Sequence, residues 1–455
     1  MSQRPWRLFA LVGGATLLTS INFSLIFIAF KAIATTMGGS ASTVQWALTG
    51  FSITAASLWV PAGWMTDRFG RERVFLWGLI LFTVGSAIVA WSPNVGFLIG
   101  GRVVQAMGLA FESSAALPIL LSVFPVERRA TIVGSLGATG GVAAAIGPVI
   151  GGALVDNIGW RATFALNVPI GLLLCAFVLW KLPLSAPLAT GSAPDAIGVV
   201  SLAAGMGTLV LAITQMHAWG FNNVRTALSL GTSVLLLSAV VARSVRHPDP
   251  VLYLPLFREA SFRLGVILNF LIAGTFAGTF FAFIRLLTVG WGLSTYRAGL
   301  AVAVIPLFGG PLSFLAGRIA DRHGPRWVIV PGAVLISAAG LWFSLAVTQH
   351  RDIAGLWLPV AAIYGIGVGF AHAACQGAAL RNVAPERLGI GGSMSRLGMD
   401  IGGIITVAVA VALVTSVDDA ITGVRRFTLL VSVVAAVGAI YALRLSKGDP
   451  VTHRV

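Results

Sequence analysis

Long apolar runs recur along the whole chain, and they constrain its fold more than any other feature. Each run has about 20 residues, which is the length that an α-helix needs to cross the hydrocarbon core of a bilayer. A transmembrane β-barrel would instead show alternating segments of about 10 residues. The 455 residues are 57% hydrophobic and 10% charged, and this composition excludes a soluble globule and a disordered chain. The sequence therefore predicts an all-α membrane protein.

Fourteen apolar segments are predicted to span the membrane. Six precede and six follow a central pair, and because the total is even, both termini are predicted to lie on one side. In chain order the segments are 8–34, 44–65, 74–91, 96–121, 130–154, 162–182, the central pair 196–215 and 226–244, and then 262–287, 297–316, 327–347, 354–378, 391–414 and 425–444.

The distribution of Lys and Arg predicts the orientation. With the amino terminus in the cytoplasm, twenty basic residues fall in inside loops and tails and six fall in outside loops. This excess follows the positive-inside rule, so both termini are predicted to be cytoplasmic. The six outside residues are Arg161, Arg225, Arg297, Arg351, Arg425 and Arg426.

Other sequence features exclude several classes of function. The net charge of +15 is dispersed over short loops, whereas a nucleic-acid site needs basic residues clustered on one face. Cys175 and Cys375 lie inside apolar segments and are interpreted as small core residues. The sequence contains no P-loop, zinc motif or nucleophile elbow. We therefore expect no enzymatic activity, no cofactor and no metal, and we expect an ion gradient to supply the energy.

An internal repeat indicates two related halves. The segment GWMTDRFGRER at 63–73 recurs as GRIADRHGPRW at 317–327. The offset of 254 residues equals eight spans at the mean spacing of this chain, so two spans are inserted between two halves of six. Parallel halves of this kind recur in transporters, with the substrate site near the bilayer midplane between them. The predicted domains are a six-helix bundle at 1–184, the two inserted helices at 185–250 and a second six-helix bundle at 251–455.

The repeated loop also predicts a conformational lock. Its aspartate can accept hydrogen bonds from backbone N–H groups at a neighbouring helix start, and its arginines can bind carboxylates or carbonyls of the adjoining bundle. A positively charged inside loop without a switching role is the alternative interpretation. The predicted lock residues are Gly63, Asp67, Arg68, Gly70 and Arg71, with Asp321 and Arg322 in the second copy.

Five motifs are similar to the signatures of a known transporter family. They are GWMTDRFGRER at 63–73, Arg102 followed by VVQAMG, GPVIGG at 147–152, WRATFALNVPIG at 160–171 and HPDPVLYLPLFREASFR at 247–263. Through these motifs the chain resembles the major facilitator superfamily, and in particular its fourteen-helix drug/proton antiporter group. The resemblance covers nearly the whole chain.

The resemblance implies the major facilitator fold, with two six-helix bundles and two inserted helices. It implies a monomeric secondary transporter in the bacterial cytoplasmic membrane, with a small organic substrate, protons and membrane lipids as partners. In the family the fifth-helix motif is associated with export, although a purely structural kink explains its residues equally well. The residues of this motif are Gly147, Pro148, Gly151 and Gly152.

The first helix departs from the pattern of the group. The aspartate that is typical there is replaced by Asn22, which cannot carry a proton. Two acids, Glu112 and Asp400, instead lie inside predicted spans. An acid at the centre of a membrane helix costs about 2.5–3.5 kcal/mol and therefore needs a partner or a function. Arg102 lies about 15 Å from Glu112 along one helix, and it can face Asn22 across the bundle.

Glu112 is the predicted proton carrier, because no basic residue lies within one turn of it on its own helix. A neutral Glu112 that is hydrogen-bonded within the bundle is the alternative. Asp400 follows Arg396 by one helical turn, so a local ion pair is its alternative interpretation. Arg102 and Asp400 are predicted to act as electrostatic modulators. The predicted cavity residues are Asn22, Glu112, His372, Gln376 and Arg396, and for His372 a satisfied buried side chain is an equally good explanation.

The leading hypothesis from the sequence is proton-coupled efflux of amphipathic or cationic organic compounds by alternating access. A lipid or metabolite exporter, or a facilitator, with altered or absent proton coupling is the main alternative, because Asn22 replaces the expected acid. A membrane scaffold without transport activity would need a large soluble domain, which the sequence does not contain.

Overall fold

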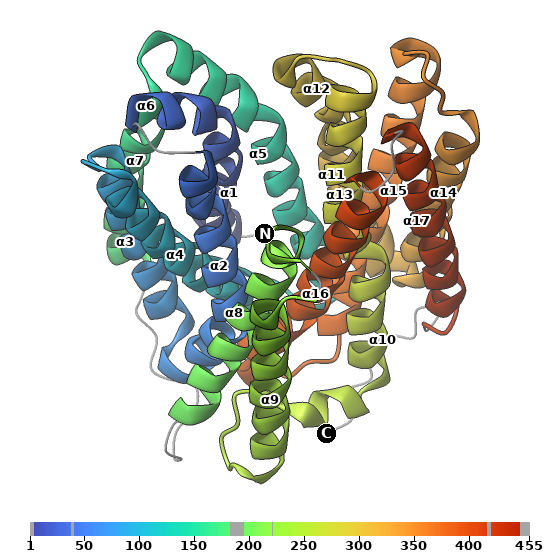
Figure 1. Ribbon diagram of the computed structural model, residues 1–455. Helices are drawn as coiled ribbons and strands as arrows, with labels where there is room; N and C mark the ends of the chain where they lie inside the picture. Colours follow the sequence, from blue (N-terminus) through green and yellow to red (C-terminus); the bar gives the residue numbers. More distant parts are fainter. Residues whose placement is uncertain (1–3, 38–40, 183–194, 221, 416–419, 446–455) are drawn as a thin grey trace. The chain divides into compact units, whose positions relative to one another are not determined.

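The computed structural model describes residues 4–37, 41–182, 195–220, 222–415 and 420–445. Every regular element in these residues is a helix (Figure 1). The predicted domain boundary at 184 lies outside the described residues, and the predicted domains stay a prediction.

Seventeen α-helices are present in the described part of the chain. They are α1 (Arg4–Met37), α2 (Ala41–Phe69), α3 (Arg71–Ala90), α4 (Val95–Val123), α5 (Arg129–Asn157), α6 (Trp160–Ala165), α7 (Asn167–Lys181), α8 (Ala196–Trp219), α9 (Val224–Arg246), α10 (Ala260–Leu268), α11 (Thr275–Arg285), α12 (Thr295–Val302), α13 (Val304–His323), α14 (Arg326–Ala346), α15 (Leu358–Leu380), α16 (Leu388–Thr415) and α17 (Ala420–Ala442).

Short helical segments connect or interrupt these helices. Three are 3₁₀-helices: η1 (Val126–Arg128), η2 (Leu254–Arg258) and η6 (Pro385–Arg387). Three are π-helices: η3 (Asn269–Ala273), η4 (Leu286–Gly290) and η5 (Ile353–Trp357).

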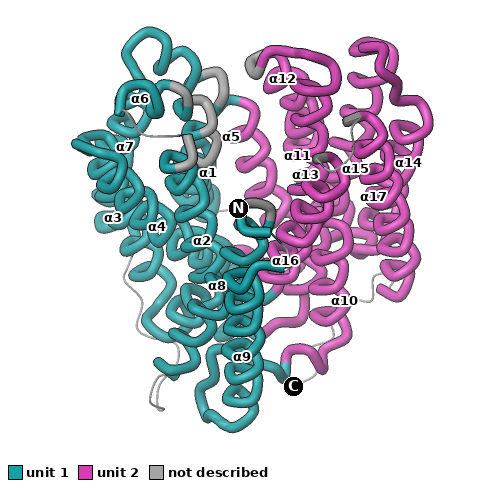
Figure 2. Tube along the Cα trace, viewed as in Figure 1, with its two compact units in different colours: residues 1–123, 146–255, 384–394 teal, residues 124–145, 256–383, 395–455 magenta. Residues whose placement is uncertain are grey.

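The chain forms two compact units, which Figure 2 shows in two colours. Unit 1 contains residues 1–123, 146–255 and 384–394, and unit 2 contains residues 124–145, 256–383 and 395–455. The beginning of α5 therefore packs within unit 2, and the beginning of α16 packs within unit 1. These two helix starts are central to the site described below.

Twelve of the described helical segments are long and apolar enough to cross a membrane. Ala196–Met216 and Val224–Arg246 are two of them, so the central pair of predicted spans is helical and of sufficient length. The helices α1 and α2, with 34 and 29 residues, are not among the twelve. The total of fourteen spans stays a prediction.

Large apolar side chains cover much of the outer surface of these helices. Trp180, Val245 and Leu345 are each more than 70% exposed. In water such exposure would be unfavourable by about 25 cal/mol for each Å² of apolar surface, whereas in a bilayer these side chains contact lipid tails. The surface therefore agrees with the membrane environment that the sequence predicts.

The inserted helices α8 and α9 form a hairpin that packs through α8 against α2. The carboxylate of Asp195 caps the start of α8 by accepting a hydrogen bond from the N–H of Gly198, at 2.8 Å. The same carboxylate forms an ion pair with Arg243 of α9. A single buried aspartate thus fixes one end of the hairpin.

Two predicted continuous spans are interrupted in unit 2. The segment 262–287 runs through α10, η3, α11 and the first two residues of η4, and the segment 297–316 is divided between α12 and α13 at Ala303. Pro306 explains the second interruption, because it has no N–H to donate to the carbonyl of Val302. The π-helix η3 inserts one extra residue into a turn, a feature that is frequent at functional sites.

We predict that the turn between α8 and α9 is extracellular, because α8 is the seventh predicted span from a cytoplasmic amino terminus and both flanking helices have the length of a membrane span. The test uses Asn222→Cys in a background where the two buried free cysteines are replaced by Ala. A membrane-impermeant maleimide should label this variant in intact cells. Pro248→Cys, beyond the other end of α9, is the control and should react only after permeabilisation. Labelling of Asn222→Cys only in permeabilised cells would contradict the topology.

Candidate functional site

The two copies of the repeated loop have the same backbone geometry. Gly70 separates α2 from α3 with φ 97°, and Gly324 separates α13 from α14 with φ 94°. Both values lie in the left-handed region, which a residue with a Cβ adopts only with strain. The glycine at this position of the repeat is therefore required by the turn that both copies form.

Asp67, at the end of α2, caps the beginning of α16 in unit 1. Its two carboxylate oxygens accept hydrogen bonds from the N–H groups of Gly389 and Ile390, at 2.9 and 2.8 Å. These N–H groups have no partner within their own helix, and the positive end of the helix dipole lies there. The carboxylate thus satisfies two free donors and stabilises the helix start.

Asp321, at the equivalent position of α13, caps the beginning of α5 in unit 2. Its carboxylate accepts hydrogen bonds from the N–H groups of Ala130 and Thr131, at 2.9 and 2.8 Å, and from the Thr131 hydroxyl. The two copies of the repeat therefore make the same interaction, each with the start of a helix more than 180 residues away in the sequence.

Close backbone contact accompanies each cap. A Cβ added to Gly63 would lie 2.5 Å from the carbonyl oxygen of Gly389, and a Cβ added to Gly317 would lie 2.3 Å from that of Ala130. Real Cβ atoms do not approach backbone oxygen so closely. Glycine at the first position of the repeat is what allows each aspartate to reach its helix start.

Arginines bind the carbonyl groups next to these helix starts. Arg71 donates to the carbonyl of Pro118, at 3.3 Å, and to that of Pro385, the first residue of η6, which precedes α16. Arg129, the first residue of α5, donates to the carbonyls of Leu380, Arg381 and Val383 at 2.9–3.1 Å. These bonds satisfy carbonyl groups at the end of α15 and in the loop that follows it.

Arg129 was not identified as a site residue from the sequence. A signal was available, because Glu-Arg at 127–128 precedes α5 and Glu-Arg at 386–387 precedes α16. This second repeat marks the two helix starts that the aspartates cap.

The two remaining lock arginines lie nearer the surface. Arg68 forms an ion pair with Asp249, at 3.4 Å, in the loop that follows α9. This pair connects two motifs that the sequence analysis had treated separately. Arg322 is exposed.

The Asp67 carboxyl lies beyond the predicted span 44–65 and is only 7% exposed. Burial raises the pKa of Asp67 to about 7, although the bonds from Ile390 and Gly389 and the charge of Arg71 act in the opposite direction. Its charge, and with it the strength of the cap on α16, therefore changes with pH near neutrality.

Glu112 is fully buried in α4, among hydroxyl groups of α1. Thr16 Oγ1 donates to its Oε1 at 2.8 Å, and Thr19 Oγ1 donates to its Oε2 at 3.2 Å. The neighbouring Ser113 hydroxyl also donates to Oε2, at 3.0 Å. A hydroxyl group can donate to a carboxylate and accept from a carboxylic acid, so this environment can serve both protonation states.

Arg102 is fully buried on the same helix and faces Asn22 of α1. Its Nη1 donates to Asn22 Oδ1 at 2.7 Å and to Gln105 Oε1 at 3.0 Å. The guanidinium carbon lies 4.0 Å from the centre of the Phe51 ring, which adds a cation–π interaction. The residue that replaces the expected aspartate is thus the direct partner of the arginine.

A second polar cluster lies in unit 2 and includes residues that the sequence analysis missed. Asn269, the first residue of η3, donates to Ser395 Oγ at 2.8 Å and to Gln376 Oε1 at 3.3 Å. Ser395 also donates to Gln376, at 3.1 Å. His372 lies one turn before Gln376, and its ring centre is 6.0 Å from that of Phe276, with the two rings tilted by 42°. The π-turn at Asn269 was the feature that sequence periodicity could not reveal.

Arg396 and Asp400 form an ion pair one turn apart on α16, with 3.9 Å between Nε and Oδ2. This is the local pairing that their spacing predicts. Glu112 belongs to unit 1 and Asp400 to unit 2, and the roles of both acids stay predictions.

The glycines of the fifth-helix motif lie within α5. Within α5 the chain passes from unit 2 to unit 1 after residue 145. The three glycines of the motif lie just beyond this point, at Gly147, Gly151 and Gly152. The side chain of Pro148 lies outside the described residues. A Cβ on Gly152 would meet no atom within 4 Å, so its role in close packing stays a prediction.

These features define the class of protein: a multi-pass helical membrane protein in which one loop motif occurs twice with the same geometry. The chain belongs to the Major Facilitator Superfamily, whose family model matches residues 12–294 and 265–454.

Named relatives and a solved structure agree with this assignment. The chain is 30% identical over 423 residues to the tetracenomycin C resistance and export protein of Streptomyces glaucescens, covering 91% of this chain and 76% of that protein. It is 28% identical over 406 residues to the multidrug resistance protein B homolog of Mycobacterium tuberculosis, covering 88% and 74%. The fold is similar to that of FucP, a superfamily transporter solved in the outward conformation, with a TM-score of 0.68, 16% identity and coverage of 97% and 99%.

We predict that Asp67→Asn slows transport about tenfold, because loss of the charge weakens two charge-assisted hydrogen bonds by about 1.4 kcal/mol in total and so destabilises the capped state that each cycle must form again. Equilibrium binding of a cationic dye should stay within twofold, since Asp67 lies beyond the predicted span. Asp321→Asn should have a similar effect through α5. Asp156→Asn, which removes an exposed acid, is the control and should transport normally. An equal loss of affinity and rate in Asp67→Asn would argue against a lock.

Proposed function

We propose that this transporter exports amphipathic or cationic organic compounds in exchange for protons. The observation that carries the proposal is the buried carboxyl of Glu112, which accepts hydrogen bonds from Thr16, Thr19 and Ser113. Proton exchange needs a group that is stable in both protonation states, and hydroxyl partners meet this requirement because they can donate or accept. The names of two relatives, an export protein and a multidrug resistance protein, support the class of cargo.

In the proposed cycle Arg102 acts as an electrostatic modulator of Glu112. Asn22 does not titrate, so the positive charge of Arg102 has an amide rather than a carboxylate as its partner. Loss of the Glu112 proton then places a negative charge on the helix that carries this cation. The Arg396–Asp400 pair modulates the field in unit 2.

The lock residues control access in this proposal. Asp67 and Asp321 occupy equivalent positions of the repeat. Release of the Asp67 cap frees the start of α16, and release of the Asp321 cap frees the start of α5. Both caps consist of short, charge-assisted hydrogen bonds, so they strongly stabilise the conformation in which they are formed. The residues proposed for cargo binding are Asn22 and Glu112 in unit 1 and His372, Gln376 and Arg396 in unit 2.

We further propose fourteen membrane helices, as in the drug/proton antiporter group. The twelve apolar segments, together with α1 and α2, give this number. An even number agrees with two cytoplasmic termini in a bacterial cytoplasmic membrane, and we propose a monomer as the working unit.

A lipid or metabolite exporter without proton coupling is the second candidate. The observation that favours it is the Asn22–Arg102 hydrogen bond, because the group's acid is absent at that position. The two candidates differ in one measurable property, which is the response of transport to a pH gradient.

We predict that Glu112→Gln abolishes the acceleration of dye export by an imposed pH gradient in proteoliposomes. The amide keeps hydrogen-bonding capacity toward the hydroxyl groups but cannot exchange a proton. Counterflow of the dye without a gradient should stay within about threefold of the unsubstituted protein.

Asp400→Asn is the matched control, because it neutralises the other acid within a predicted span. It should keep the gradient response. If Glu112→Gln responds to the gradient and Asp400→Asn does not, the assignment of the proton carrier is wrong. If transport by the unsubstituted protein does not respond to the gradient, the second candidate is correct.

A further inference from the structure

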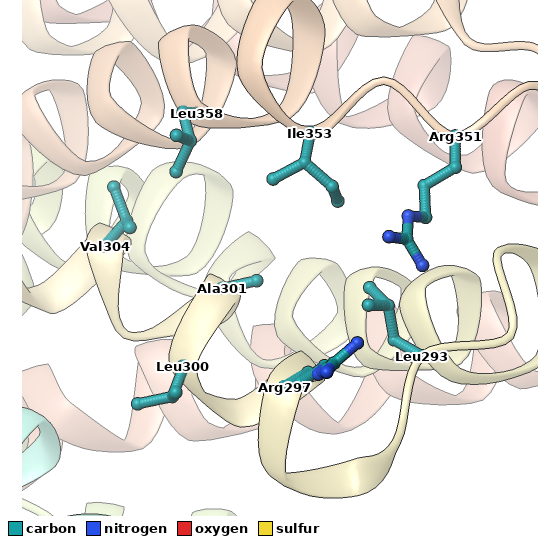
Figure 3. Close-up of a pocket in the computed structure, with 8 residues that line it drawn as sticks. All are labelled: Leu293, Arg297, Leu300, Ala301, Val304, Arg351, Ile353 and Leu358. Carbon is teal, nitrogen blue, oxygen red and sulfur yellow. The ribbon is translucent and has the colours of Figure 1, made fainter.

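A hollow of about 420 Å³ lies in unit 2, where α12 and η5 begin. Figure 3 shows eight of its lining residues. Two are arginines and six are apolar: Leu293, Arg297, Leu300, Ala301, Val304, Arg351, Ile353 and Leu358. Its volume lies within the range of about 300–1,000 Å³ that is typical of small-molecule sites. None of these residues belongs to the lock or to the coupling groups.

The charges in this hollow are not compensated by its walls. Within the described part of the chain, the guanidinium groups of Arg297 and Arg351 form no ion pair or hydrogen bond, and none of the described lining residues is acidic. The nearby carboxylate of Asp352 caps η5 by accepting from the N–H of Gly355, at 2.7 Å. Two guanidinium groups at one hollow favour an anionic ligand, and they bind phosphate with particular strength.

The hollow is also divided into a charged and an apolar part. In Figure 3 the two guanidinium groups lie toward one end, near Leu293, and Val304 and Leu358 lie toward the other. The apolar surface continues along α13, where Leu307 and Phe308 are 60% and 42% exposed. A ligand that fits both parts has an anionic head and an apolar tail.

The position of the hollow matches the headgroup region of a bilayer. Arg297 is the first residue of the apolar segment Arg297–His323, and Arg351 precedes the apolar segment Ile353–Leu380 by two residues. Arginines at the ends of membrane helices lie at the depth of lipid phosphates. The exposed side chains of α13 lie further along the span, at the depth of the acyl chains.

We propose that this hollow binds an anionic phospholipid, with its phosphate between Arg297 and Arg351 and one acyl chain along Leu300, Val304 and Leu307. A zwitterionic lipid is less favourable because its ammonium group would approach the same two cations. The bound lipid would fix the start of α12 relative to the start of α15, next to the break at Ala303.

The experiment measures lipid retained by the purified full-length protein, using native mass spectrometry. The protein is incubated with equal amounts of phosphatidylglycerol and phosphatidylcholine that have identical acyl chains. The unsubstituted protein should retain phosphatidylglycerol preferentially, and the double variant Arg297→Gln/Arg351→Gln should retain at least fivefold less of it. Unchanged retention in this variant would overturn the proposal.

The double variant Arg225→Gln/Arg426→Gln is the matched control. It removes two exposed arginines from the same predicted side of the membrane and should retain phosphatidylglycerol like the unsubstituted protein. An equal loss in this control would show that net charge, rather than the hollow, determines retention. Arg297→Lys/Arg351→Lys preserves the charge and should keep at least half of the lipid, which separates lost binding from misfolding.

Two further measurements distinguish a lipid from other anions. Glycerol 3-phosphate at the same concentration should not displace the lipid, because it lacks the tail, and Leu300→Asn should weaken lipid binding at least threefold. Displacement by glycerol 3-phosphate would make the hollow a site for a soluble phosphate. Loss of dye binding in Arg297→Gln/Arg351→Gln would make it a cargo site, and either result would overturn the lipid assignment.

Discussion

The structure depends on how two helix starts obtain acceptors for their free N–H groups. In a membrane protein these groups cannot all form hydrogen bonds with water, and an unpaired donor in an apolar environment costs several kcal/mol. Asp67 and Asp321 solve this problem for α16 and α5 with two short bonds each. The same carboxylates face the positive ends of the helix dipoles. Because the acceptor belongs to a distant segment, each helix start is stable only while that segment stays in place. In the proposed lock, a conformational change needs the cap to be released or replaced by water.

The surrounding residues follow from this constraint. Glycine at 63 and at 317 lets the backbones approach closely enough for the bond, and glycine at 70 and at 324 allows the turn that directs the aspartate. Arg129 donates to the carbonyl of Leu380 at the end of α15, and Arg71 donates to the carbonyl of Pro385 in η6, so these backbone acceptors are also satisfied. The repeat is thus a set of geometric requirements for one interaction, made twice.

Much of this was predictable from the sequence, because the relevant signals are local or repeated. Apolar length predicted the helices, and the internal repeat predicted that Asp67 and Asp321 have equivalent positions. The sequence analysis allowed Arg102, in the fourth predicted span, to face Asn22 of the first span across the bundle, and the structure has this pair. In contrast, the cluster of Asn269 with Ser395 depends on a π-turn and on side-chain packing across 126 residues of sequence, which periodicity does not encode. The repeated Glu-Arg pair at 127–128 and 386–387 marks the two helix starts, but it does not show that Arg129 binds backbone carbonyls, because backbone acceptors have no sequence signature of their own.

The separation of charges in unit 1 has a consequence for the proposed exchange. An aspartate at position 22 would form a neutral pair with Arg102, and the proton carrier would then switch the unit between neutral and negative. With Asn22, the summed charge of Arg102 and Glu112 is instead positive when Glu112 is protonated and zero when it is ionised. The described partners of Arg102 are uncharged: the side-chain amides of Asn22 and Gln105 and the rings of Phe51 and Phe164. A cation therefore meets electrostatic repulsion from the protonated unit, and release of the Glu112 proton removes that repulsion. Exchange of one proton for one monovalent cation returns the unit to the same total charge. The proton and the cation therefore weaken each other's binding by electrostatic repulsion, even without a shared contact. This competition is the thermodynamic requirement for antiport, since each ligand must weaken the binding of the other.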